Sequence, residues 1–148
     1  MYKHILIATD GSELAAKGVE HGLALAKPLG ARVTVLTVTE PLPAEAVDDA
    51  KRESVRDPLG EYERQMDQYV ATLMKGAKAT ASGLGIAIEI SRETDTSPAE
   101  AIVRSARLNG CDLIVTSSHG RRGINKLLLG SQTSEVLART TIPVLVVR

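Results

Sequence analysis

A glycine-rich, basic segment near the end of the chain combines residue types that hold phosphate groups. Gly120, Gly123 and Gly130 are spread through this segment, and Gly130 is followed directly by Ser131. Positive side chains lie between the glycines, at Arg121, Arg122 and Lys126. Glycine lets a backbone come close to a ligand, and arginine and lysine supply positive charge. The segment therefore predicts a site for a phosphate-bearing ligand, most simply a nucleotide.

The elements on either side of this segment would aim its backbone at such a ligand. A short apolar run at residues 113–116, rich in β-branched side chains, indicates a buried strand. A last helix is predicted from about Gln132 to Arg139, with Gly130 and Ser131 at its start. The first N–H groups of a helix have no partner within it, and the helix dipole is positive there. This order of elements is typical of an anion site.

Strands and helices alternate along the rest of the chain. The other predicted strands are residues 5–8, 33–38, 86–90 and 144–147. Helical periodicity separates them, in one helix that ends at Leu29 and Gly30, a long helix over 58–82 that ends at Gly83, and a helix from Ser97 to Asn109. Five strands joined by helices predict an α/β fold with one open parallel sheet and helices on both faces.

Residues 39–57 interrupt this alternation with two prolines and mixed charges. A short helical piece is predicted near residues 44–52. A connection of this length is either a surface segment or a lid over a ligand, and we favour the surface segment because long loops are more often variable than catalytic.

Composition limits the classes of function. The 148 residues suit one domain over 1–148, and the lack of Phe and Trp predicts an aliphatic core. Eighteen basic and eighteen acidic residues cancel, which argues against a nucleic-acid or membrane-surface partner. The lone Cys111 is expected to be a small buried hydrophobe. No apolar run is long enough for a signal peptide or a membrane span, so we expect a cytoplasmic protein.

One longer pattern identifies a family. Ser117-Ser118-His119-Gly120 is followed, after nine residues, by Gly130-Ser131. The chain opens with the strand and turn Ile5-Leu6-Ile7-Ala8-Thr9-Asp10-Gly11-Ser12 and closes with Pro143-Val144-Leu145-Val146-Val147. Over its whole length it resembles the universal stress protein family, whose ATP-binding branch carries Gly-x-x-Gly, nine residues, then Gly-Ser/Thr.

The resemblance implies a Rossmann-like fold, a ligand and its contacts. The strand order would be 3-2-1-4-5, with the ligand where strands 1 and 4 diverge. The ligand would be ATP, with Mg²⁺ held mainly by its phosphates. Ala8, Thr9 and Asp10 would line the nucleoside end, and Val38 would touch adenine. The ribose and phosphates would meet residues from the last strand–loop–helix unit: Thr116, Ser117, Gly120, Arg121, Gly130, Ser131 and Gln132.

Three of these positions carry alternatives. Ser117 stands where the family has its first glycine, so a requirement for positive φ there would weaken the site, whereas a requirement for only an N–H would not. Asp10 could instead cap the first helix, because Asp10 and Glu13 fit a capping box. Ser131 could likewise be only the N-cap of the last helix.

Three functions fit the sequence. The first is an ATP-binding regulatory protein of the stress response, acting on unknown protein partners. The second is a slow ATPase or phosphotransferase, and the third is a nucleotide-independent interaction module. A homodimer through the final strand is also predicted, because residues 144–147 are continuously apolar yet would lie at a sheet edge.

Overall fold

The computed structural model describes residues 1–119 and 129–148, which form one parallel sheet flanked by helices. The strands are β1 (His4–Ala8), β2 (Arg32–Thr39), β3 (Ile88–Thr94), β4 (Leu113–Ser117) and β5 (Val144–Val147). The helices are α1 (Glu13–Leu29), α2 (Ala44–Arg52), α3 (Pro58–Leu73), α4 (Lys75–Leu84), α5 (Pro98–Leu108) and α6 (Ser131–Arg139).

The sheet has the predicted order, β3-β2-β1-β4-β5, with every neighbouring pair parallel. β1 lies at the centre and pairs Ile7 with Val35 on one side and with Val115 on the other. The chain leaves β1 toward β2 and later returns to β4, so the direction of winding reverses between β1 and β4. The carboxyl ends of these two strands therefore border the switch point predicted for the ligand.

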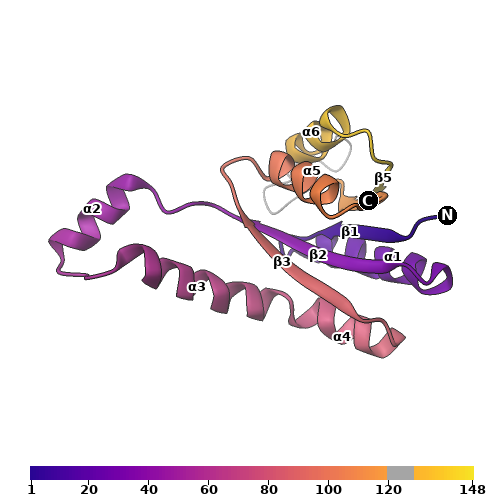
Figure 1. The fold of residues 1–148 in the computed structure, drawn as a ribbon, viewed down its shortest axis with the longest axis horizontal. Helices are drawn as coiled ribbons and strands as arrows, with labels where there is room; N and C mark the ends of the chain where they lie inside the picture. Colours follow the sequence, from indigo (N-terminus) through magenta and orange to yellow (C-terminus); the bar gives the residue numbers. More distant parts are fainter. Residues whose placement is uncertain (120–128) are drawn as a thin grey trace.

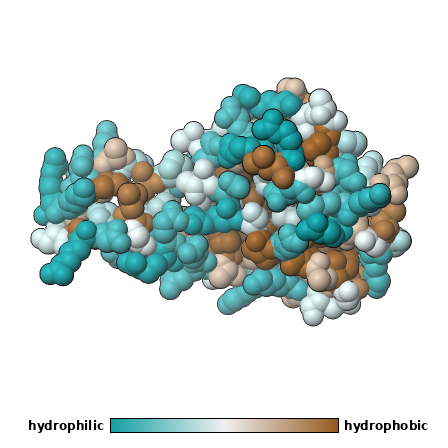
Figure 2. Space-filling model, in the orientation of Figure 1, coloured by the Kyte–Doolittle hydropathy of each residue, from teal (hydrophilic) through white to brown (hydrophobic). Residues whose placement is uncertain are grey.

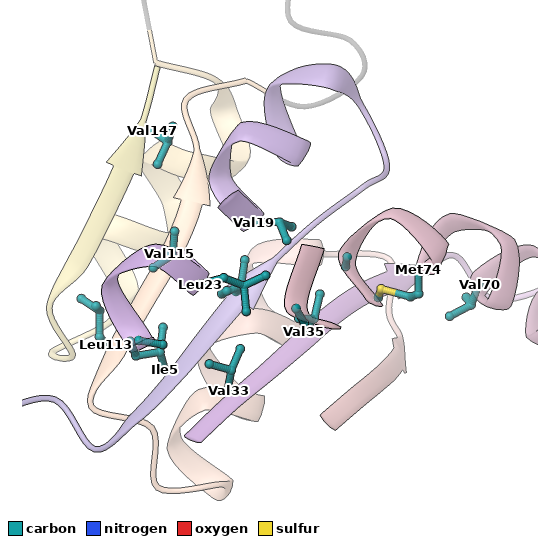
Figure 3. Close-up of a cluster of buried hydrophobic side chains, with 14 residues drawn as sticks. Ile5, Val19, Leu23, Val33, Val35, Val70, Met74, Leu113, Val115 and Val147 are labelled. Carbon is teal, nitrogen blue, oxygen red and sulfur yellow. The ribbon is translucent and has the colours of Figure 1, made fainter. Parts of the chain in front are cut away.

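An aliphatic core covers both faces of the sheet. On one face, α1 and α4 pack on the sheet around residues that include Leu23, Val35 and Met74 (Figure 3). On the other face, α5 and α6 lie side by side over Leu36 and Ile114 (Figure 1). Helix α1 can approach closely because a Cβ at its Gly22 would lie only 2.5 Å from the Ile7 side chain.

The single helix predicted for residues 58–82 is wrong, because the chain forms two helices that meet at Met74. Met74 is completely buried in the core, and its backbone (φ −83°, ψ −5°) departs from α-helical geometry. Helix α4 ends at Gly85 rather than Gly83, since Gly85 is the residue that adopts the left-handed conformation (φ 71°). The bend lets α4 follow α1 while α3 runs beyond the sheet (Figure 1).

Strand β3 begins and ends later than predicted. Its isoleucines face the core as their alternation indicated, but the strand continues through Thr94 because all of β2 from Val33 to Thr39 pairs with it. Arg92 follows the isoleucines on the same face and forms ion pairs with Glu63 and Asp67 of α3. The hydrophobic pattern did not predict this extension because its residues, from Ser91 to Thr94, are polar.

The connection over residues 39–57 contains α2 as predicted. Helix α2 buries none of its residues and lies with the outer end of α3 in an arm that projects from the sheet (Figure 1). Figure 2 shows mostly hydrophilic side chains on this arm, with a small hydrophobic group among them. Of the described residues, none forms a helix that is both long and apolar enough to span a bilayer.

Cys111 is buried among apolar side chains, as expected. Burial raises the pKa of its thiol to about 11, so the side chain stays a neutral hydrophobe at physiological pH.

Candidate functional site

A cavity of about 460 Å³ opens at the switch point, between the ends of β1, β2 and β4 and the starts of α5 and α6. Nine of the eleven predicted site residues line it: Ala8, Thr9, Asp10, Val38, Thr116, Ser117, Gly130, Ser131 and Gln132. The other two, Gly120 and Arg121, lie outside the described residues. Its volume falls within the range of small-molecule pockets.

The turn after β1 forms one wall. The backbone N–H of Thr9 donates to the carbonyl of Leu36 at 2.9 Å, which extends the β1–β2 pairing to the cavity. The carboxylate of Asp10 accepts the N–H of Ser12 at 3.0 Å. The cap of α1 is Ser12, whose hydroxyl accepts the N–H of Ala15. The capping-box alternative for Asp10 is therefore wrong, because Asp10 shapes the turn that precedes the cap.

The end of β4 forms the opposite wall. Thr116 lies on the same face of β4 as Ile114, and only 8% of its surface is exposed. Its hydroxyl lines the cavity and has no hydrogen-bond partner among the residues that the structure describes. Because Thr116 borders the open cavity, its hydroxyl is available to donate to or accept from a polar ligand.

Ser117 fits its position without backbone strain. It does not have a positive φ, so this position does not require glycine for its conformation. Its hydroxyl donates to the carbonyl of His119 at 3.0 Å, and its own carbonyl accepts the hydroxyl of Thr133 at 2.7 Å. A serine that donates to a carbonyl rather than to a basic side chain is not activated as a nucleophile.

Gly130 is packed against the end of β4. Its N–H donates to the Ser118 carbonyl at 2.6 Å, and an added Cβ would lie 3.0 Å from that same oxygen. Its conformation (φ −62°, ψ 153°) is open to any residue, so glycine is needed here for close approach. Gly130 is also the N-cap of α6, which corrects the alternative for Ser131: this serine is the exposed first residue of the helix.

Gln132 joins the two helix starts that border the cavity. Its side-chain oxygen accepts the backbone N–H of Ala99 in the first turn of α5, at 3.0 Å. Since that N–H can only donate, the amide oxygen must face it, and the amide nitrogen is left as a donor. Gln132 therefore supports α5 and keeps two N–H groups available for a ligand.

Six lining residues were not predicted from the sequence: Leu36, Glu40, Thr96, Pro98, Ile102 and Thr133. They come from the end of β2, the turn after β3 and the starts of α5 and α6. The rule that ligands lie beyond the carboxyl ends of parallel strands could have found those that follow β2 and β3. Leu36, Val38 and Ile102 make an apolar wall that could hold a flat ring.

The lining of this cavity offers groups that can bind a ligand. It combines an apolar wall, hydroxyl groups and the N-terminus of α6, which attracts anions. Among the described residues, no group of three His, Cys, Asp or Glu side chains could hold a metal ion. The residues present thus fit a ligand that has both an apolar ring and an anionic group.

Comparison with known proteins identifies the family. The model of the universal stress protein family matches residues 1–148. A universal stress protein of Thermus aquaticus is 33% identical over 150 residues, which cover 100% of both chains. The solved structure of MJ0577, a universal stress protein of Methanocaldococcus jannaschii, has a TM-score of 0.79 at 29% identity and covers 99% of this chain and 96% of that one.

A universal stress protein solved in complex with cAMP shares the fold, with a TM-score of 0.70 at 23% identity over 99% of this chain and 97% of that one. That relative binds an adenine nucleotide. Full-length matches to the family model, to the Thermus relative and to the MJ0577 structure agree with the observed fold. The chain therefore belongs to the universal stress protein family.

Proposed function

We propose that this protein binds ATP and acts as a nucleotide-dependent regulator in the stress response. The observation that carries the proposal is the cavity at the switch point, where the unpartnered Thr116 hydroxyl, the Gln132 amide and the start of α6 converge. These groups are donors or positive dipole ends, and they lie opposite an apolar wall. The cAMP complex of a relative supports an adenine nucleotide as the ligand.

The lining suggests how ATP would lie. The adenine ring would pack between Val38 and Ile102, and Ala8, Thr9 and Asp10 would surround the nucleoside. The phosphates would lie at the start of α6, near Gly130 and Ser131, where N–H groups lack helical partners. We assign Mg²⁺ to the phosphates, because the described lining offers carboxylates only at the nucleoside end.

Calorimetry with ATP, ADP and adenosine tests this proposal. We expect saturable binding of all three, with ATP bound more tightly than adenosine because only ATP reaches the start of α6. Thr116→Val should weaken ATP binding by roughly two- to tenfold, since it removes one hydrogen bond without changing the shape of the side chain. Thr72→Val, at an exposed position of α3, is the matched control.

A second measurement needs no titration. The chain contains three Tyr and no Trp, so co-purified adenine would dominate its ultraviolet spectrum. Denaturation should release the nucleotide for chromatography. If calorimetry with nucleotide-free protein gives no heat for any of the three ligands, the nucleotide-independent interaction module becomes the better account of the protein.

We also propose a homodimer that forms through β5. This strand is a sheet edge of four apolar residues, where Val144 and Val146 are only half-buried and Leu145 is 36% exposed. Pairing with the same strand of a second copy about a two-fold axis would satisfy its open N–H and C=O groups.

A further inference from the structure

Helix α3 contacts the strand end that forms one wall of the candidate nucleotide cavity. The hydroxyl of Tyr62, on α3, donates a hydrogen bond to the backbone carbonyl of Glu40. Glu40 directly follows β2 and lines the cavity. The chain leaves the sheet at Glu40, forms α2 and returns along α3. This hydrogen bond therefore joins the exit of the arm to its return.

Arg92 of β3 makes a second contact between α3 and the end of β2. Its guanidinium donates to the Thr39 hydroxyl at 3.1 Å and pairs with the carboxylates of Glu63 and Asp67 on α3. Only 17% of the Arg92 side chain is exposed. Thr39 directly follows Val38, whose side chain lies on the opposite face of β2 and lines the cavity. Together the two contacts fix the end of the strand that forms the cavity wall.

The outer half of α3 has a polar rather than an apolar attachment to the sheet. The buried residues of α3 are Pro58, at the outer end of the helix, and Val70, near its inner end. The side chains of Glu63 and Asp67 are 50% and 72% exposed. Polar contacts at exposed positions contribute little free energy because water competes for the same groups. The arm can therefore be released from the strand end at small cost, without opening the core.

We propose that nucleoside binding and attachment of the arm are coupled through the end of β2, with Tyr62 and Arg92 as positioning residues. This inference rests on the proposed function, because it names how the same cavity would be regulated. An adenine ring packed on Val38 needs the strand end in its present position, which is the position that the two contacts fix. By linkage, the attached arm strengthens nucleotide binding by the same factor by which the nucleotide favours the attached arm. Nucleotide occupancy thereby changes the surface that the arm offers to a partner.

Tyr62→Phe removes only the hydroxyl that reaches Glu40. In calorimetry we expect this variant to bind adenosine roughly two- to tenfold more weakly than wild type, which is the range that one hydrogen bond contributes. ATP should lose the same factor, because the strand end contacts the nucleoside and not the phosphates. Tyr2→Phe makes the same exchange before β1, at the amino end of the sheet, and should leave both affinities unchanged.

The ion pairs of Arg92 allow a second test with an uncharged ligand. Adenosine carries no charge, so salt acts on its binding mainly through the protein. Salt at about 1 M screens the pairs of Arg92 with Glu63 and Asp67, so it should weaken adenosine binding more in wild type than in Arg92→Met. At low salt, Arg92→Met should bind adenosine more weakly than wild type. An equal salt dependence of the two proteins would overturn the role of Arg92.

Hydrogen exchange measures the same coupling from the side of the arm. Helix α2 has nine residues, and a helix of this length is marginal without its partners, so its amides should exchange faster when the arm is released. Although α2 does not line the cavity, saturating adenosine should slow exchange in α2, and it should do so less in Tyr62→Phe. Exchange in α4, which has Ala77 and Ala81 buried in the core, should stay the same.

The outcomes separate this inference from the proposed function. If wild type binds adenosine and Tyr62→Phe binds it equally well, the coupling is overturned while nucleotide binding is retained. The same conclusion follows if adenosine binds but leaves exchange in α2 unchanged. If wild type binds neither adenosine nor ATP, the proposed function fails and this inference fails with it.

Discussion

The side-chain oxygen of Gln132 accepts the backbone N–H of Ala99 at 3.0 Å, so one amide ties the first turn of α6 to the first turn of α5. Gln132→Glu keeps an acceptor for this N–H but loses the amide donors and adds a negative charge. We expect Gln132→Glu to retain wild-type stability and to bind ATP at least about tenfold more weakly than wild type, with a much smaller effect on adenosine.

Gln132→Met is the matched comparison for that variant. It removes both the acceptor and the donors, so it should lower the melting temperature as well as ATP affinity, because Ala99 N–H loses its partner. Calorimetry and thermal unfolding measure the two effects. Equal affinity of Gln132→Glu and wild type for ATP would show that the amide does not face the phosphates.

Gly130 is predicted to tolerate no side chain. In Gly130→Ala the new Cβ would lie 3.0 Å from the Ser118 carbonyl oxygen, so either the start of α6 or the end of β4 must move. We expect a lower melting temperature and weaker ATP binding. Gly76→Ala is the control, because a Cβ there meets no atom within 4 Å and alanine favours the helix. Unchanged behaviour of Gly130→Ala would show that the contact can relax freely.

Ser117 stands where the family pattern has glycine, and its backbone conformation does not require one. Ser117→Ala removes only the hydrogen bond to the His119 carbonyl. We expect a loss of about 1 kcal/mol in the free energy of unfolding, measured with urea, and an ATP affinity within roughly twofold of wild type. Ser117→Gly tests the departure itself, and markedly tighter ATP binding by that variant would show that the serine obstructs the ligand.

The turn that leads into α5 is predicted to be sensitive to acid. The backbone N–H of Ser97 at 2.9 Å, together with the Arg104 guanidinium at 3.1 Å, holds the pKa of Asp95 below its ordinary value. A carboxyl whose pKa is lower in the folded state stabilises the fold above its unfolded pKa of about 4, and this contribution is lost as the pH falls through the folded pKa. Asp95→Asn should therefore be less stable than wild type near pH 7.

The difference between wild type and Asp95→Asn should shrink as the pH falls below about 4, because the wild-type carboxyl becomes protonated. Urea midpoints at a series of pH values measure this. A stability difference that stays constant down to the most acidic pH would assign the effect to geometry rather than to charge.

The proposed dimer can be tested at its centre. Val146→Lys places a charge in the middle of β5, and we expect this variant to be monomeric by light scattering while wild type is dimeric. Lys75→Val, on α4, makes the reverse exchange at a position outside β5, and this control variant should stay dimeric. A monomeric wild type would remove the proposal, and a dimeric Val146→Lys would move the interface elsewhere.

The strand order and most of the cavity lining were predicted through the resemblance to the family, whereas local patterns predicted the strands themselves. The runs at β1, β2 and β4 are nearly all apolar, so their position in a covered parallel sheet was evident. The glycine and serine at the start of α6 marked the anion end of the cavity. The bend at Met74 could not be predicted, since it depends on how that side chain fills the core between the sheet and α4.

The alternatives at Asp10 and Ser131 show a second limit. Ser12 rather than Asp10 caps α1, and Gly130 rather than Ser131 caps α6. All of these residue types are favoured at N-caps, so only the path of the backbone decides which residue takes the position. The hydrogen bond by which Gln132 supports α5 could not be predicted either. Its partner, Ala99, is 33 residues away in the sequence and contributes only a main-chain N–H.

The two sheet edges differ in a way that limits how many copies could assemble. The outer strand β3 carries charged residues such as Glu89 and Glu93, and Arg92 binds it to α3, whereas β5 is apolar throughout. Two chains joined at β5 would expose only β3 at both ends of a continuous ten-stranded sheet. A charged edge resists further strand addition, so growth would stop at that point. The apolar edge at β5 would favour pairing, and the charged edge at β3 would protect the pair from extending into a fibre.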